Sequence, residues 1–109
     1  MELRSTEPRS IKLQTELEDL LGTTNVYFQP GPDVELEYPC IVYNRITAYQ
    51  PKANDFTYLF RPGYEVSYIN RDEPDPDILE RISRHFRCSN YIRHFIVDNL
   101  HHDVFTIYY

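Results

Sequence analysis

The residues best suited to chemistry lie near the end of the sequence, in the segment DNLHHD that runs from Asp98 to Asp103. Two adjacent histidines between two aspartates offer imidazole nitrogens and carboxylate oxygens. These groups bind Zn²⁺ and act as acids and bases near neutral pH. A small metal-dependent enzyme built on this segment would use His101, His102 and Asp103.

The spacing of these residues argues against a shared metal ion. Adjacent residues of a strand point to opposite faces, so His101 and His102 would not chelate one ion there. His85 or His94 could add a ligand, but no spacing in the sequence predicts it. Turn chemistry explains the segment more simply, because Asp and Asn bond their own backbone and tolerate left-handed conformations. We therefore expect a structural hairpin whose turn and first strand residues include Asp98, Asn99, His101, His102 and Asp103, with Phe105 in the core.

Other signatures of catalysis are weak. The three glycines form no phosphate-binding loop, and no G-x-S-x-G segment occurs. Cys88 and His85 stand three residues apart, but no further group is evident that would orient the imidazole as a base. Prolines interrupt the acidic run from Asp72 to Asp77, where a calcium loop of the EF-hand type needs a glycine. We predict no enzyme, no catalytic residue, no cofactor and no metal.

Composition narrows the class of protein further. The 109 residues carry a formal net charge of −6, which argues against a general nucleic-acid binder. No apolar stretch approaches the length of a membrane span, and the first ten residues lack the apolar region of a signal peptide. Cys40 and Cys88 form neither a disulfide framework nor a zinc pattern. We expect one domain over residues 1–109, with residues 1–9 as a flexible arm, folded in a reducing cytoplasm.

Two helices are predicted from apolar periodicity. The first carries a stripe of leucines, with Ser10 as its N-cap and Gly22 as its stop. The second begins after Asp75 as N-cap, with Pro76 in its first turn. The predicted apolar stripes are Leu13, Leu17, Leu20 and Leu21 in the first helix, and Leu79, Ile82 and Phe86 in the second.

Apolar and alternating segments predict the strands. The segment from Tyr38 to Tyr49 is apolar on both faces, which favours a central, covered strand. We expect the segment RPG, residues 61–63, to interrupt the sheet. The fold class is α+β, with two helices on one face of a mostly antiparallel or mixed sheet of four to five strands, in the order α-β-β-β-α-β-β. The other predicted strands cover residues 26–29, 56–60, 64–71, 91–97 and 103–109.

Charge is distributed unevenly along the chain. Basic residues gather in the last turns of the second helix, where positive charge also suits the helix dipole. Acidic residues gather in the loop before the central strand. Separate patches of opposite charge would let copies of the chain meet head to tail. The predicted interface comprises Arg81, Arg84, Arg87, Asp33, Glu35 and Glu37.

Three segments of the chain resemble a family of small proteins of long-tailed bacteriophages: the tail terminator, tail completion or minor structural proteins. These segments are YPCIVYNR, YEVSYINRDEPDPDI and VDNLHHDVFTIYY, and the resemblance extends from about Leu17 to the C-terminus. The part from Asp98 to Phe105 is the most specific. The sequence departs from the family at His101, where asparagine is usual.

The resemblance implies a structural virion protein without catalysis. Several copies, six by the symmetry of such tails, would close a ring that caps the tail tube. The partners implied are the tail tube protein and the head–tail connector, with DNA only passing through the lumen and no membrane involved. The protein would be made in the cytoplasm of a host bacterium and would reside at the head–tail junction. A head-completion or connector protein at the same junction is the alternative within this class.

Overall fold

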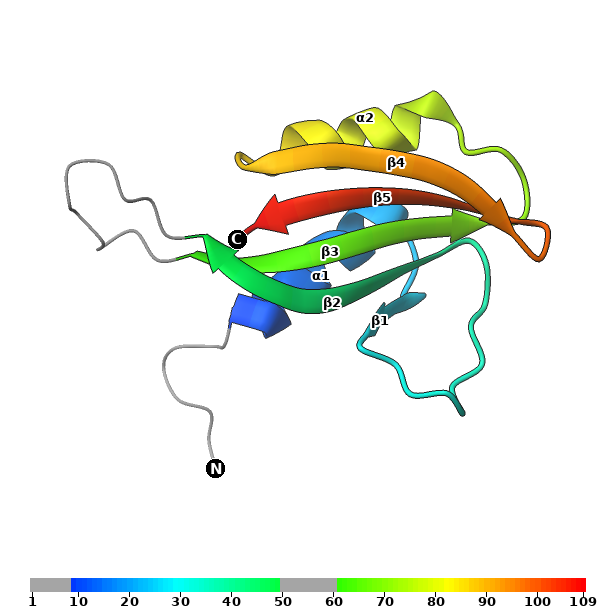
Figure 1. Cartoon of the computed structure of the whole chain (residues 1–109), viewed down its shortest axis with the longest axis horizontal. Coiled ribbons are helices and arrows are strands. Elements are labelled where there is room, and N and C mark those ends of the chain that lie inside the picture. Colours follow the sequence, from blue (N-terminus) through cyan, green and yellow to red (C-terminus); the bar gives the residue numbers. More distant parts are fainter. Residues whose placement is uncertain (1–8, 50–60) are drawn as a thin grey trace.

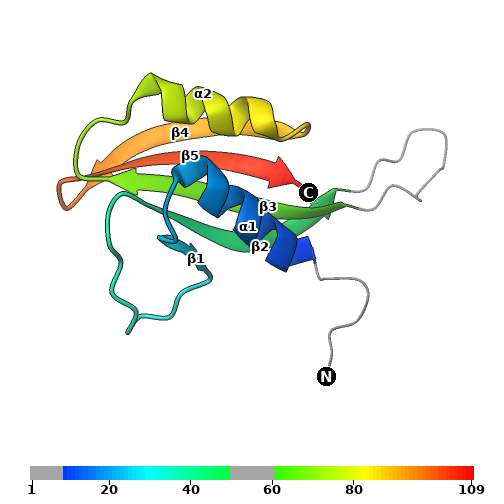
Figure 2. The ribbon, with the colours of Figure 1, turned by 180° about the vertical axis from the view of Figure 1, so that it is seen from behind.

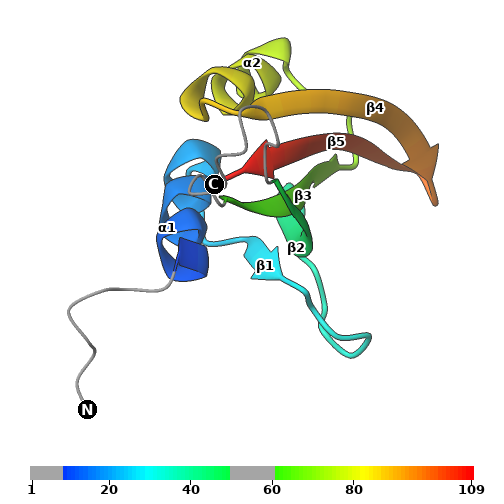
Figure 3. The same ribbon diagram turned by 60° about the vertical axis from the view of Figure 1, so that its left-hand side comes forward.

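The computed structural model describes residues 9–49 and 61–109 and shows one five-stranded sheet with two helices packed against it (Figure 1). Seen from the side, both helices lie on the same face of the sheet (Figure 3). This confirms the predicted α+β class and the predicted order of elements. The elements are α1 (Arg9–Leu21), β1 (Val26–Phe28), β2 (Cys40–Tyr49), β3 (Arg61–Asn70), α2 (Pro76–His85), β4 (Ser89–Val97) and β5 (Leu100–Tyr108).

The sheet is mixed, and its strands stand in the order β1-β2-β3-β5-β4. The short β1 runs parallel to β2, and every other neighbouring pair is antiparallel. The β4–β5 hairpin joins the sheet through β5, which pairs with β3 on its other side. The last strand in the sequence is therefore an inner strand, and β4 forms one edge of the sheet.

The leucine stripe of α1 packs as its spacing predicts. Leu13 and Leu17 are fully buried. The helix ends at Gly22, whose positive φ of 89° suits a residue without a side chain and whose N–H donates to the Glu18 carbonyl at 2.8 Å. The start of the helix was predicted wrongly, because α1 begins at Arg9 and Ser10 lies inside it. Arg9 therefore does not belong to an arm, and residues 1–8 lie outside the described residues.

The start of α2 follows from local sequence alone. Asp75 is the N-cap and accepts a hydrogen bond from the Asp77 N–H at 3.0 Å, and Pro76 opens the helix. Ile78 and Ile82 are buried, so the apolar stripe is centred one residue before the predicted Leu79, which is half-buried. The helix ends at His85, so Arg87 lies beyond it rather than in its last turn.

The prediction that residues 61–63 interrupt the sheet was wrong. β3 begins at Arg61 and contains both Pro62 and Gly63. Proline is tolerated there because it lies near the strand end, where the register between β2 and β3 shifts. The Pro62 carbonyl accepts a hydrogen bond from the Tyr109 N–H at 3.0 Å. The predicted strand at residues 56–60 lies outside the described residues.

The main core fills the space between the sheet and the helices. Tyr43 and Tyr64 lie at its centre, with ring centroids 6.0 Å apart. A smaller buried group occupies the opposite face of the sheet, which neither α1 nor α2 covers, and consists of Cys40, Ile69 and Val104. Burial raises the pKa of Cys40 to about 11, so its thiol stays protonated near neutral pH. The sheet therefore buries apolar side chains on both faces, and on this second face two of them lie at strand ends, Cys40 at the start of β2 and Ile69 near the end of β3.

Candidate assembly surfaces and the C-terminal hairpin

The last hairpin turns on two residues, Asp98 and Asn99. Their φ angles are 52° and 63°, and Val97 pairs with Leu100 on either side. Two consecutive left-handed residues form a turn whose twist matches that of the flanking strands. His101 and His102 lie within β5. The two histidines are thus among the first strand residues rather than in the turn, which consists of Asp98 and Asn99, and the strand begins three residues before the predicted residue 103.

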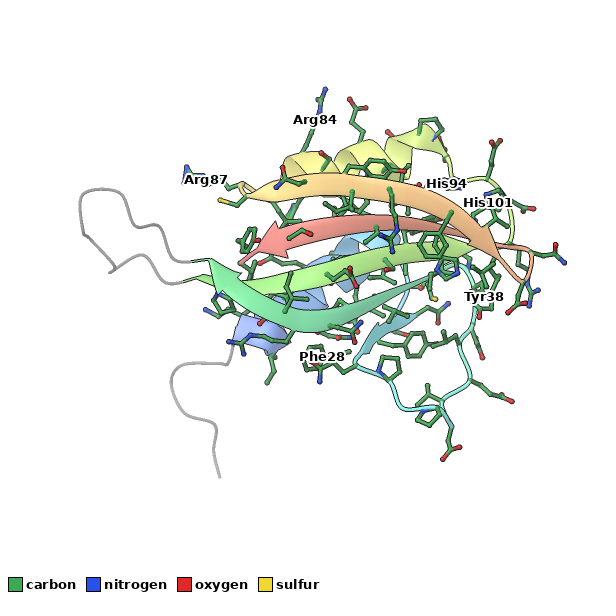
Figure 4. All side chains as sticks on the ribbon, viewed as in Figure 1. Phe28, Tyr38, Arg84, Arg87, His94 and His101 are labelled. Atoms are coloured by element: carbon green, nitrogen blue, oxygen red, sulfur yellow. The ribbon has the colours of Figure 1, made fainter. Side chains whose placement is uncertain are left out.

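The two histidines of β5 point to opposite faces of the hairpin. His101 meets His94 of β4, with the His94 Nε2 and the His101 Nδ1 3.1 Å apart. Figure 4 shows His94 and His101 next to each other. On the other face the rings of His102 and Phe95 stack with centroids 4.6 Å apart. Burial lowers the pKa of His102 below its usual 6.5, an effect that Asp103 opposes and His94 reinforces.

Asp103 is buried, which the sequence did not predict. Its side chain is 2% exposed, and its Oδ1 accepts a hydrogen bond from the Tyr91 hydroxyl at 2.7 Å. Burial and this bond to the carboxylate raise the pKa of Tyr91 to about 12. The Asp103 Oδ2 has no hydrogen-bond partner among the described residues.

His101, His102 and Asp103, the residues that the alternative of a metal-dependent enzyme would use, do not converge in the structure. His102 lies on the face opposite to the other two, because side chains alternate along β5. Over residues 9–49 and 61–109, no three His, Cys, Asp or Glu side chains converge as metal ligands. His85 lies elsewhere, with its Nε2 2.8 Å from Glu16. The two histidines that do meet are His94 and His101, a pair that the spacing in the sequence did not predict.

The edge strand β4 exposes large apolar side chains on both of its faces. Among the described residues β4 pairs with β5 alone, so its outer backbone groups lack a strand partner. Unpaired edges of this kind readily accept another strand. Its register with β5 shifts between Tyr91 and Arg93. The exposed apolar residues are Tyr91 (47%), Ile92 (49%), Ile96 (56%) and Val97 (48%).

The opposite side of the sheet is also incompletely covered. β1 pairs with β2 only over three positions, Ile41 to Tyr43, although β2 continues to Tyr49. Three further large apolar side chains are exposed on this side: Phe28, Val34 and Ile46. Of the eight exposed large apolar residues in the described part of the chain, only Ile11 on α1 lies away from these two sides.

The predicted basic patch is only partly available to a neighbour. Arg81 donates from its guanidinium to the Leu20 carbonyl at 3.0 Å and so ties α2 to the end of α1. Arg84 forms an exposed ion pair with Glu80 at 2.8 Å, one helical turn away. Arg87 is exposed after the end of α2, and Arg84 points away from the body of the molecule (Figure 4). Arg93 adds a further exposed cation on β4 itself.

The predicted acidic residues lie in the loop between β1 and β2, and all three are exposed. This loop lies at the opposite end of the molecule from α2 and β4, as the views from the front and from behind agree (Figures 1 and 2). We call the two sides the basic edge and the acidic edge. The basic edge comprises Tyr91, Ile92, Ile96 and Val97 with Arg84, Arg87 and Arg93, and the acidic edge comprises Phe28, Val34 and Ile46 with Asp33, Glu35 and Glu37.

Sequence reasoning missed the apolar part of both edges. For the edge formed by β4, the sequence signal was the segment YIRHFIV, where apolar residues fall on both faces of one strand. Such a pattern also fits a covered inner strand, and only the strand order shows that β4 lies at the edge.

Comparison with known proteins assigns the chain to no family. No protein-family model matches the chain, and no curated protein matches it in sequence. Within the described residues, neither helix has the length and apolar character needed to cross a membrane.

Proposed function

We propose that this protein is a structural subunit that assembles head to tail into a closed ring at the end of a bacteriophage tail. The observation that carries the proposal is the pair of complementary edges on opposite sides of one sheet. The basic edge carries exposed apolar side chains and exposed arginines. The acidic edge carries exposed apolar side chains and exposed carboxylates, with Arg45 as an exposed cation next to Ile46.

A head-to-tail contact uses two different surfaces of the same chain, and such contacts close into rings when the rotation between copies allows it. Apolar residues at the centre of the contact would supply most of the affinity. The charged residues around them would steer docking and fix the register. When the basic edge of one copy meets the acidic edge of the next, exposed apolar side chains of both edges become covered and opposite charges face each other.

The sequence resemblance supplies the biological setting of the proposal. It implies a tail terminator or tail completion protein, with six copies capping the tail tube and joining it to the head–tail connector. DNA would pass through the lumen, and no membrane would be involved. No catalytic residue is part of this proposal.

The test is to change the basic edge without disturbing the fold. Ile96→Ser with Val97→Ser removes two exposed apolar groups at the end of β4, and Ile11→Ser on α1 serves as the matched control. We expect native mass spectrometry and electron microscopy to show uniform rings for the parent and the control, formed alone or on tail tubes. The double variant should remain a folded monomer.

Two outcomes would contradict the proposal. The parent could stay monomeric both alone and in the presence of tail tubes, or the double variant could form the same rings as the parent. Locating the protein in the virion would separate the terminator from a head-completion protein, because only the terminator contacts the tube directly.

A further inference from the structure

We propose that His94 and His101 together bind one divalent transition-metal ion, with Zn²⁺ as the representative of the class. The two histidines come from neighbouring strands of the last hairpin, and their facing nitrogens are 3.1 Å apart. His94 lies on β4, the strand of the basic edge, but this inference concerns metal binding by the single chain and does not depend on ring closure.

The distance between the nitrogens suits a shared ion. Zinc binds histidine nitrogens at about 2.0–2.1 Å, so two such ligands at a tetrahedral angle stand about 3.3 Å apart. The observed separation is within a few tenths of an ångström of this value. Both side chains are at least partly exposed, so an ion can enter and water can complete its coordination.

The backbone holds the pair in position. His94 lies directly across from Asp103, and His101 precedes Asp103 by two residues, so all three occupy one face of the hairpin. The turn at Asp98 and Asn99 fixes the register of the two strands. Because the backbone already fixes the positions of the two histidines, they lose little conformational entropy when an ion binds.

The hydrogen bond between the two rings can be exchanged for bonds to one metal ion. Two imidazoles in contact share a hydrogen bond only while at least one of them is neutral. A divalent ion takes the place of this hydrogen bond and is bound by one nitrogen of each neutral ring. Each ring keeps its own proton on its other nitrogen, and any extra proton on the pair is released to solvent. The Asp103 carboxylate on the same face adds negative charge, and its Oδ2 has no hydrogen-bond partner among the described residues.

The other two histidines of the chain are occupied differently. His85 faces Glu16 at 2.8 Å, and its ring meets Phe86 edge-on. His102 stacks on Phe95 on the far face of the hairpin. They are therefore internal controls, since a site made of His94 and His101 needs neither of them.

The experiment is a calorimetric titration of the untagged, chelator-treated protein with zinc chloride. We expect one equivalent per chain for the parent, and a loss of affinity of at least about tenfold for His94→Gln and for His101→Gln. His85→Gln and His102→Gln should bind as the parent does.

Copper provides a second measurement that does not depend on heat. The electron paramagnetic resonance spectrum of the Cu²⁺-loaded parent should show coupling to two imidazole nitrogens, reduced to one in either variant of the pair. Absence of stoichiometric binding would overturn the proposal. So would parent-like binding by His94→Gln, or an equal loss of affinity in His102→Gln.

Discussion

Phe105 is the aromatic residue of β5 that connects the last hairpin to the main core. Its side chain is 1% exposed and meets the Tyr91 ring edge-on, with centroids 5.2 Å apart. Phe105→Ala should lower the free energy of unfolding by about 3–5 kcal/mol, because it removes buried apolar area and leaves a cavity. Urea denaturation measures this loss. The control Thr106→Ala changes a half-buried neighbour on the other face, and an equal effect of both changes would contradict this role for Phe105.

His102 should make stability depend on pH. Its folded pKa lies below the unfolded value of 6.5, mainly because burial disfavours the charged ring. The unfolded chain therefore binds more protons than the folded chain below about pH 6.5. The stability that neutral His102 contributes is fully present above about pH 6.5 and is lost as the pH falls toward the lower folded pKa.

The effect of His102 is measured by urea midpoints at about pH 7.5 and about pH 5.5, with metal chelated. His102→Gln should show a smaller decrease between these two pH values than the parent does. His85→Gln is the comparison, since it changes a histidine outside the hairpin. An unchanged decrease in His102→Gln would show that other groups cause the acid sensitivity.

At this scale the sequence predicted apolar burial well and polar burial poorly. Alternation along the last strand placed Phe105 and Ile107 on the core face, and both are buried. The same alternation puts Asp103 on that face, but Asp103 was predicted only as one of the polar residues at the start of the hairpin strand. What keeps Asp103 buried is the Tyr91 hydroxyl from β4, a contact that depends on strand register.

Among the elements, α2 owes its start to a single cap. The Asp75 side chain accepts the Asp77 N–H, which otherwise has no partner within the helix. Asp75→Ala should lower the free energy of unfolding by about 1 kcal/mol, within a usual range of about 0.5–2 kcal/mol. Thermal or urea denaturation measures the change. Asp72→Ala, in the same acidic run but outside the helix, should have a smaller effect, and an equal loss would contradict the capping role.

Helix starts and ends were predictable where the capping chemistry is local. Asp75, Pro76 and Gly22 carry their own structural signals, and each acts at the predicted place. Ser10 carries the same type of signal but lies inside α1, because the helix extends to Arg9. Pro62 was misread for the opposite reason: its place in β3 depends on the register with β2, which no local pattern shows.

At the scale of the whole molecule, opposite charges should set the register of the proposed ring. Arg81 is not suited to a test, because it holds the end of α1. Arg84→Glu with Arg87→Glu instead reverses two exposed charges of the basic edge. We expect this variant to fold normally but to form fewer rings, because it would face the acidic loop of its neighbour with like charge.

The companion change is Glu35→Lys with Glu37→Lys in the same protein, which restores opposite signs across the contact. Ring formation, counted by electron microscopy, should recover in part. Lys12→Glu on α1 is the control for charge alone. Normal rings from the arginine variant would mean that apolar contacts alone fix the register.

The edges themselves could not be predicted from the sequence. Whether a strand lies at an edge depends on which strands pair, and these pairings join residues far apart in the chain. The segments YIRHFIV and CIVY look alike in apolar content, yet β4 is an edge strand and β2 is an inner strand.

The position of β5 between β3 and β4 also determines when this sheet can form during protein synthesis. A nascent chain that has emerged only as far as Val97 already contains β4, but β4 has no neighbour to join and β3 has one open side. Translation proceeds from the N-terminus, and domains generally fold as units. β4 can therefore join the sheet only after translation has passed Tyr108 and β5 has left the ribosome. The apolar side chains of β4 thus reach their place in the folded sheet late.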